Sequence, residues 1–476
     1  MISELSREAI AAHPSPVGDS LGSSARWHSF TVRLAFLVYL VFQVNAIAHH
    51  GSWGQDFEGH RHWIAEAAAN PWKFTLATDR PEPPLFYYTA VVIGRMTRNI
   101  HTLEIIAIFS LFLNAGALLV FYRLLQILVS SRLLQLAGLI FVLFLPVFMI
   151  HAIVLASDAF TMPLFIGMLY FLVQLGKEDS SPRSRHHIIW LVVLLVLSIG
   201  TKFTFVSQAL AIILSTILFW WTGRITARLA VASVTVFVLV LLAGLGIIAH
   251  SRKSIMIYVP GHEMNWTDIL VPHRHDLHVL SAPPYDEPAR VNGASNTIPA
   301  EGPLELLRPH RYSFPALAHL GMFTDILNIY QYDPSDTYFG TRSHVNQSRM
   351  HLAVRTGLLF SLAGAILTLW NGFNSFRRVV FQKLPGEAVL VAIAIAGFGW
   401  LANVVVFLPK VEAYTAGFWL PRLYVPALLA FALLSFIAFN RLTAHRSPWW
   451  QRATLCAVVL QSVVQLSFLW PWGTMH

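Results

Sequence analysis

Long apolar runs recur along nearly the whole chain, and they limit it to folds that a lipid bilayer can hold. Hydrophobic residues make up 55% of the 476 residues and charged residues 12%, about half the share usual in a soluble domain. A helix that crosses the hydrocarbon core needs roughly 20 mostly apolar residues, and many of the runs approach or reach that length. We therefore predict an all-α, polytopic membrane protein.

Eleven of these runs qualify as candidate spans, and the charges between them set their direction. The predicted spans are 32–49, 102–122, 134–152, 159–175, 187–200, 203–221, 229–250, 352–371, 387–408, 421–440 and 453–471. If the N-terminal tail is cytoplasmic, every cytoplasmic loop is basic, which is the positive-inside pattern. The short outer loops then carry Lys202 and Lys410 as their basic residues.

One apolar stretch, 85–96, is too short to cross, since it has only about a dozen residues. If it did cross, all later loops would change sides and the positive-inside pattern would fail. We therefore predict an interfacial helix on the outer surface.

The spans divide the chain into a cytoplasmic tail (1–31) and two transmembrane modules, 32–250 and 352–476. The first module includes a long outer loop, 50–101, that we expect to carry catalytic residues. A cap of about a hundred residues, 251–351, joins the seventh and eighth spans on the outer side and is rich in His, Pro and Asp.

Two features of the composition exclude other classes of protein. Cys456 is the one cysteine, so neither an internal disulfide nor a thiolate metal site is expected. The formal charge of +9 lies in short clusters between apolar runs, which assigns it to cytoplasmic loops rather than to nucleic-acid binding.

Ionisable residues gather at the outer ends of the predicted spans. They are Asp56, Glu58, His60, His62, Glu82, Asp158, Lys202, Arg355, Lys410 and Arg422. Such groups are costly near a bilayer and are functional candidates by default. Snorkelling of helix-end charges to water explains any single one equally well, but the one-sided gathering of the whole set favours a site.

Three carboxylates are the candidate catalytic acids. Asp56 follows the first span, where it could act as a general base or bind a metal. Glu82 is held by flanking prolines just before the predicted interfacial helix. Asp158 lies near the start of the fourth span, where the helix dipole would also favour an acid for structural reasons alone.

The candidate substrate-binding residues are two cations and three rings. Lys202 lies in a break between two apolar runs, and a lone lysine at that depth is stabilised by an anion such as a lipid phosphate. Arg422 is similar, since its planar fork suits phosphate. We also predict that Tyr87, Tyr88 and His60 contact substrate.

These motifs, taken in order, resemble the GT-C superfamily of integral membrane glycosyltransferases, especially bacterial relatives of protein mannosyltransferases and of the lipid A aminoarabinose transferases. The matching elements are Asp56, Pro83 to Tyr88, Asp158, Gly200 to Phe203 and Arg422 to Pro426. The resemblance implies that Asp56 is the catalytic or acceptor-positioning acid. It also implies that Glu82 and Asp158 are further acids of the cavity, where some relatives hold a divalent metal ion, and that Lys202 and Arg422 bind the carrier phosphate.

The expected function is transfer of a sugar from a polyprenyl-phosphate carrier to a cell-envelope lipid, glycan or protein. The expected location is a bacterial inner membrane, with the active site facing the periplasm or exterior. Two alternatives stay open. One is a polyprenyl-lipid flippase or transporter, although no inverted repeat or ionisable midplane helix is visible. The other is a lipid-binding or polysaccharide-ligating protein that uses His262 or His310 as its base.

Overall fold

A computed structural model describes residues 20–49, 57–71, 83–98, 102–177, 182–202, 204–251, 319, 322–323, 344–412 and 420–469. The regular structure within these ranges is entirely helical, as predicted. The helices are α2 (Ser20–His49), α3 (Phe57–Ala69), α5 (Leu85–Met96), α6 (Thr102–Leu128), α7 (Arg132–Phe144), α8 (Pro146–Ile153), α9 (Asp158–Lys177), α10 (Pro182–Ile199), α11 (Phe205–Trp221), α12 (Ala227–Ser251), α16 (His344–Gln382), α17 (Pro385–Glu412), α18 (Leu420–Thr443) and α19 (Trp449–Leu469).

Among the described helices, eight are long and apolar enough to cross a membrane, or nine if the bent pair α7–α8 is one span. The protein is therefore an integral, polytopic membrane protein. All eleven predicted runs fall on helices: one on each of α2, α6, α9 to α12 and α16 to α19, and one on the pair α7–α8. Helix α11 is shorter, and α10 begins with a Pro-Arg-Ser-Arg segment, so the count of eleven spans stays a prediction.

The predicted span 134–152 is not one straight helix. It is broken at Leu145, and α7 and α8 meet at a bend of 57°. The cause is Pro146 at the first position of α8, because proline has no N–H for the preceding turn and favours a helix start. The bend places α8 and the start of α9 in the interior of the bundle, where both are buried.

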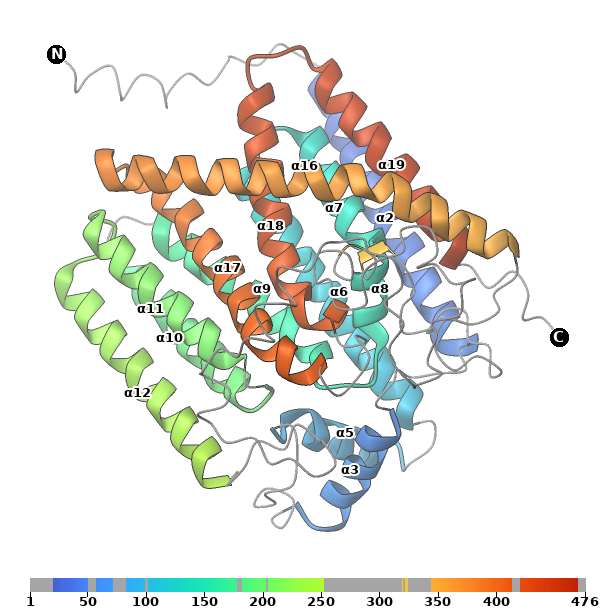
Figure 1. Cartoon of the computed structure of the whole chain (residues 1–476), viewed down its shortest axis with the longest axis vertical. Coiled ribbons are helices and arrows are strands. Elements are labelled where there is room, and N and C mark those ends of the chain that lie inside the picture. Colours follow the sequence, from blue (N-terminus) through green and yellow to red (C-terminus); the bar gives the residue numbers. More distant parts are fainter. Residues whose placement is uncertain are drawn as a thin grey trace, which may run out of the picture.

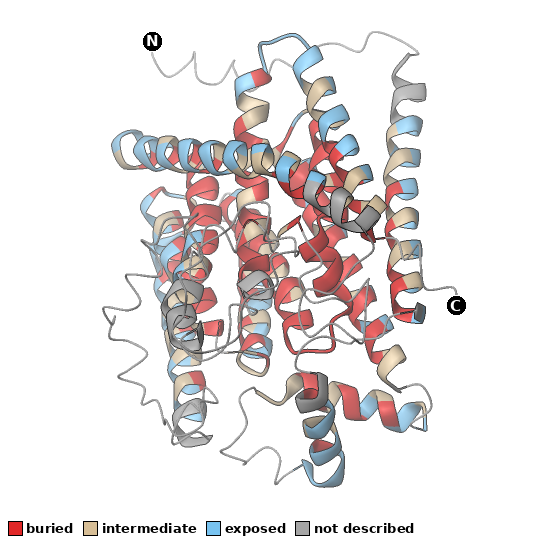
Figure 2. Ribbon diagram, turned by 45° about the vertical axis from the view of Figure 1, so that its right-hand side comes forward, coloured by how far each residue is buried: buried red, intermediate tan, exposed pale blue. Residues whose placement is uncertain are grey.

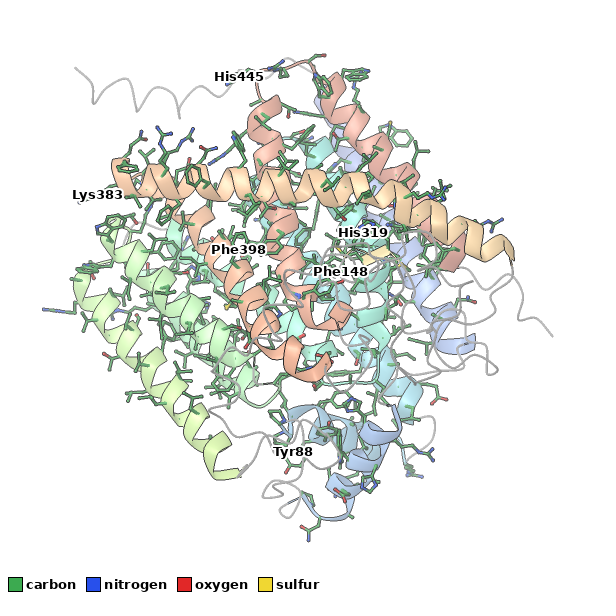
Figure 3. All side chains as sticks on the ribbon, viewed as in Figure 1. Tyr88, Phe148, His319, Lys383, Phe398 and His445 are labelled. Atoms are coloured by element: carbon green, nitrogen blue, oxygen red, sulfur yellow. The ribbon has the colours of Figure 1, made fainter. Side chains whose placement is uncertain are left out.

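The predicted interfacial helix is present as α5, with the predicted bounds 85–96. Its start follows Pro84, as expected where prolines end one segment and allow a helix to begin. Helices α3 and α5 pack on each other at one end of the bundle (Figure 1). The opposite end carries the connection from α18 to α19, where His445 is labelled in Figure 3.

Helix α16 is longer than its predicted span, 352–371. Its 39 residues give a length of about 58 Å, nearly twice the hydrocarbon thickness of roughly 30 Å. It runs almost horizontally across the vertical α18 in Figure 1, and it packs against α17, α18 and α19. Its outward face is apolar at Leu359, Ile366 and Phe373, which suits contact with lipid. The buried residues concentrate in the helices at the centre of the bundle (Figure 2).

Candidate functional site

Asp158 and Lys202 form a buried ion pair. Asp158 is the first residue of α9, and Lys202 lies in the connection between α10 and α11. The lysine Nζ donates to Oδ1 of the carboxylate, and the exposed fractions of the two side chains are 15% and 2%. Two motifs that are far apart in sequence therefore meet in one place. The pair places a carboxylate and a cation side by side at the start of a helix.

The start of α5 lies on the same connection. The backbone N–H of Leu85 donates to the carbonyl of Gly200, with an N···O distance of 2.8 Å. A Cβ added at Gly200 would lie 3.3 Å from the Cβ of Leu85, so glycine permits this close approach. The Pro-Pro-Leu element is therefore hydrogen-bonded to Gly200, which precedes Lys202 by two residues.

A small apolar cluster joins α5 to the first turn of α9. Phe86 is buried and its ring contacts that of Phe160 edge-on, with 5.7 Å between centroids. Phe160 follows Asp158 by two residues. Ile106 of α6 and Leu155 belong to the same cluster. Burial of these side chains fixes the position of α5 beside the ion pair.

Helix α3 is tied to α5 at both of its ends. His60 Nδ1 and the Tyr87 hydroxyl form a hydrogen bond of 3.0 Å, and both residues are buried. At the other end, the Tyr88 hydroxyl donates to the carbonyl of Pro71 at 2.7 Å. Tyr88 is labelled on this part of the molecule in Figure 3. These three side chains hold the α3–α5 unit together, and their predicted contact with substrate stays a prediction.

Several predicted site residues lie outside the described residues. Asp56 immediately precedes α3, and Glu82 immediately precedes the described Pro83. Arg422 lies in the first turn of α18, but its side chain is not among those described. His262 and His310, the bases of the alternative ligase hypothesis, also lie outside the described part of the chain.

The described residues alone do not form a metal site at Asp158. Within them, no three His, Cys, Asp or Glu side chains are grouped as metal ligands. The Asp158 carboxylate instead faces the ammonium of Lys202, which competes with any second cation. Metal binding through Glu82 and Asp158 therefore stays a prediction, and no step of the mechanism below depends on it.

Sequence reasoning missed a second buried carboxylate, Glu387 of α17. It accepts hydrogen bonds from Ser375 at 2.7 Å, from Arg378 at 3.0 Å and from Arg441 at 3.0 and 3.1 Å. Arg441 also donates to Asn371. The network connects α16, α17 and α18 at the end of the bundle that the sequence predicts to face the cytoplasm. A lone Glu next to Pro385 and Gly386 was the available signal, but its partners are up to 54 residues away.

The chain was compared with protein families, curated proteins and solved structures. No family model matches it, and no curated protein matches it in sequence. An oligosaccharyltransferase from Archaeoglobus fulgidus, crystallised with Zn and sulfate, aligns over 93% of this chain and 53% of its own, with 13% identity and a TM-score of 0.48. The chain thus spans about half the length of that protein.

A second solved structure is ArnT from Cupriavidus metallidurans bound to undecaprenyl phosphate. It aligns over 92% of this chain and 76% of its own, with 12% identity and a TM-score of 0.47. Both alignments extend over more than nine-tenths of this chain, at identities of 12 and 13%.

Proposed function

We propose that this protein transfers a sugar from a polyprenyl-phosphate carrier to an acceptor on the outer face of the membrane. The observation that carries the proposal is the buried pair of Asp158 and Lys202, beside the start of α5. The order of motifs around this pair, which resembles that of GT-C glycosyltransferases, supports it further.

The pair has the chemistry that a leaving phosphate needs. Removing two charges from water is costly, and their mutual attraction offsets the cost only in good geometry. A cation held in this way, in a site of low dielectric, interacts strongly with a second anion that approaches. When the carrier binds, Lys202 exchanges part of its contact with Asp158 for the carrier phosphate. Arg422 is proposed as a second cation for that phosphate.

The reaction then needs a base for the acceptor. The acceptor oxygen attacks the anomeric carbon, and the bond from that carbon to the phosphate oxygen breaks. Polyprenyl phosphate leaves with the electron pair, stabilised by Lys202 and Arg422. Asp56 takes the proton of a hydroxyl acceptor, as the resemblance implies. We assign Glu82 to orienting the acceptor and Asp158 to orienting Lys202.

The test is the release of free polyprenyl phosphate by the purified protein, given a panel of polyprenyl-phosphate sugars with envelope lipid and polysaccharide as acceptors. Lys202→Gln is expected to lower the rate by about 10²–10³-fold, as loss of a charge-stabilising donor does. The matched control is Lys383→Gln, because Lys383 is an exposed lysine just after α16. Equal rates in wild type and Lys202→Gln, with both folded, would contradict the proposal.

A further inference from the structure

Asn114 is a polar residue buried in the middle of the apolar helix α6. Its side chain is fully buried, and its Nδ2 donates two hydrogen bonds. One goes to the carbonyl of Ser110 in the same helix, at 2.8 Å. The other crosses to α9 and reaches the carbonyl of Ala159, at 3.0 Å. Asn114 therefore binds the residue that directly follows Asp158.

The carbonyl that Asn114 reaches is one that α9 cannot satisfy by itself. In an α-helix, each carbonyl accepts from the N–H four residues later. For Ala159 that residue is Pro163, which lies inside α9 and has no N–H. Ala159 is fully buried, so water is not available as a substitute. Asn114 supplies, from another helix, the donor that the proline removes.

From this geometry we propose that Asn114 and Pro163 together position the first turn of α9, and with it the Asp158 carboxylate, for the transfer reaction. The inference rests on the proposed function. Asn114 is a positioning residue rather than a catalytic one, since it acts through the backbone of Ala159. Thr161 belongs to the same turn, and its Oγ1 donates to the carbonyl of Asp158 at 2.7 Å.

Because Pro163 removes a donor from α9, the first turn of that helix depends on Asn114 in a way that ordinary side-chain packing would not require. With a residue other than proline at 163, α9 would close its own first turn and need no help from α6. With proline there, the orientation of the turn depends on α6, which also packs against α5. The direction in which the Asp158 carboxylate points toward Lys202 therefore depends on the helices that surround the site.

The test is a double-mutant cycle with Asn114→Ala, Pro163→Ala and the two combined. Asn114→Ala is expected to lower kcat for polyprenyl phosphate release roughly ten- to a hundredfold, with KM for the donor little changed, because a small misplacement of a reacting group has effects of that size. Adding Pro163→Ala returns a donor to the helix and should recover most of the loss. Thermal unfolding in detergent is measured on the same variants.

A buried asparagine elsewhere serves as the matched control. Asn371 of α16 is fully buried and donates to the carbonyl of Leu434 in α18, at 3.1 Å. The residue four positions later, Ala438, has an N–H, so no proline is involved. Asn371→Ala is expected to lower the unfolding temperature and to leave kcat per folded molecule unchanged.

The outcomes separate the possibilities. Recovery of kcat and unfolding temperature in the double variant supports positioning through the Pro163 gap. A double variant as impaired as Asn114→Ala, or a kcat that Asn114→Ala leaves unchanged, overturns it. If the wild type releases no polyprenyl phosphate from any donor, the proposed function and the catalytic part of the inference fall together. The unfolding cycle then still shows whether Asn114 compensates for Pro163.

Discussion

Two buried carboxylates occupy opposite ends of the bundle, and their surroundings differ. Glu387 accepts hydrogen bonds from three side chains carried by α16 and α18, on both of its oxygens. Asp158 pairs with a lysine that lies in a connection between helices. A carboxylate saturated by helix-borne donors ties elements together. A carboxylate paired with a cation on a connection can exchange that partner for a ligand, so we propose a structural role for Glu387 and a role in sugar transfer for Asp158.

The largest expected effect comes from replacing both members of the ion pair of Asp158 and Lys202. Asp158→Asn with Lys202→Met leaves no buried charge, and such double replacements are often nearly neutral for stability. The protein should therefore keep its unfolding temperature while sugar transfer falls by at least about 10²-fold. Thermal unfolding and donor turnover are measured on the same preparation. A double variant that is folded and fully active would contradict the proposed difference in role between the Asp158–Lys202 pair and Glu387.

At the Glu387 end of the bundle, the expected effect is on stability alone. Glu387→Gln leaves two arginines without their carboxylate. Loss of one partner of a buried pair costs about 3–5 kcal/mol, but Arg378 and Arg441 are 51% and 33% exposed, so about 2 kcal/mol is more realistic. Chemical unfolding in detergent gives the stability, and turnover is normalised to folded protein. A fall in normalised turnover would show that this network also serves the reaction.

A smaller effect is expected from tightening the contact between α5 and the Lys202 connection. In Gly200→Ala, the new Cβ meets the Cβ of Leu85 at 3.3 Å, so one of the two segments must shift by a few tenths of an ångström. Overpacking of this kind costs about 1 kcal/mol. We expect a modest fall in stability and a larger relative fall in turnover. Gly116→Ala is the control, since a Cβ there meets nothing within 4 Å.

The smallest effect concerns His319, which lies in the predicted cap. It is buried and forms hydrogen bonds with Ser361 at 3.0 Å and the Val354 carbonyl at 3.2 Å, both on α16. Burial lowers the pKa of His319 below its usual value of 6.5. The unfolded chain therefore takes up the proton first, so this contribution to stability is complete above pH 6.5 and declines as the pH falls below it.

Unfolding temperatures measured between pH 7.5 and pH 5.5 would test this (about two units around the usual histidine pKa). The wild type should lose more stability over that interval than His319→Gln. Parallel profiles for the two proteins would show that the ring is not held in its neutral form. The side chains shown to bond Glu387 are those of Ser375, Arg378 and Arg441, so that network offers no comparable histidine among them.

Much of the fold could be predicted from the sequence, because bilayer thickness and loop charge restrict the possibilities. The bounds of α5 followed from its prolines and its length. The break at Leu145 was missed, since Val142, Leu143 and Leu145 continue the apolar run up to Pro146 and hydropathy does not register a lost N–H. The length of α16 was also missed, because tilt depends on neighbouring helices.

For the site, sequence order identified Asp158 and Lys202 but not that they pair. Their contact spans 44 residues and depends on how α9 meets the α10–α11 connection. Asn114 could have been noticed as a lone amide in an apolar run. Its role becomes visible only when Ala159 and Pro163 are seen opposite it. The sequence pattern shows which polar or charged residues would be costly to bury. The three-dimensional packing shows which hydrogen bonds and ion pairs offset that cost.

The most direct test of the central claim is a turnover measurement on protein reconstituted in liposomes, with polyprenyl-phosphate sugars as donors and Asp56→Asn beside the wild type. The wild type should release free polyprenyl phosphate and form a glycosylated acceptor, and folded Asp56→Asn should do neither at a comparable rate. Movement of the intact carrier across the bilayer without cleavage, in both proteins, would contradict it and identify a transporter instead.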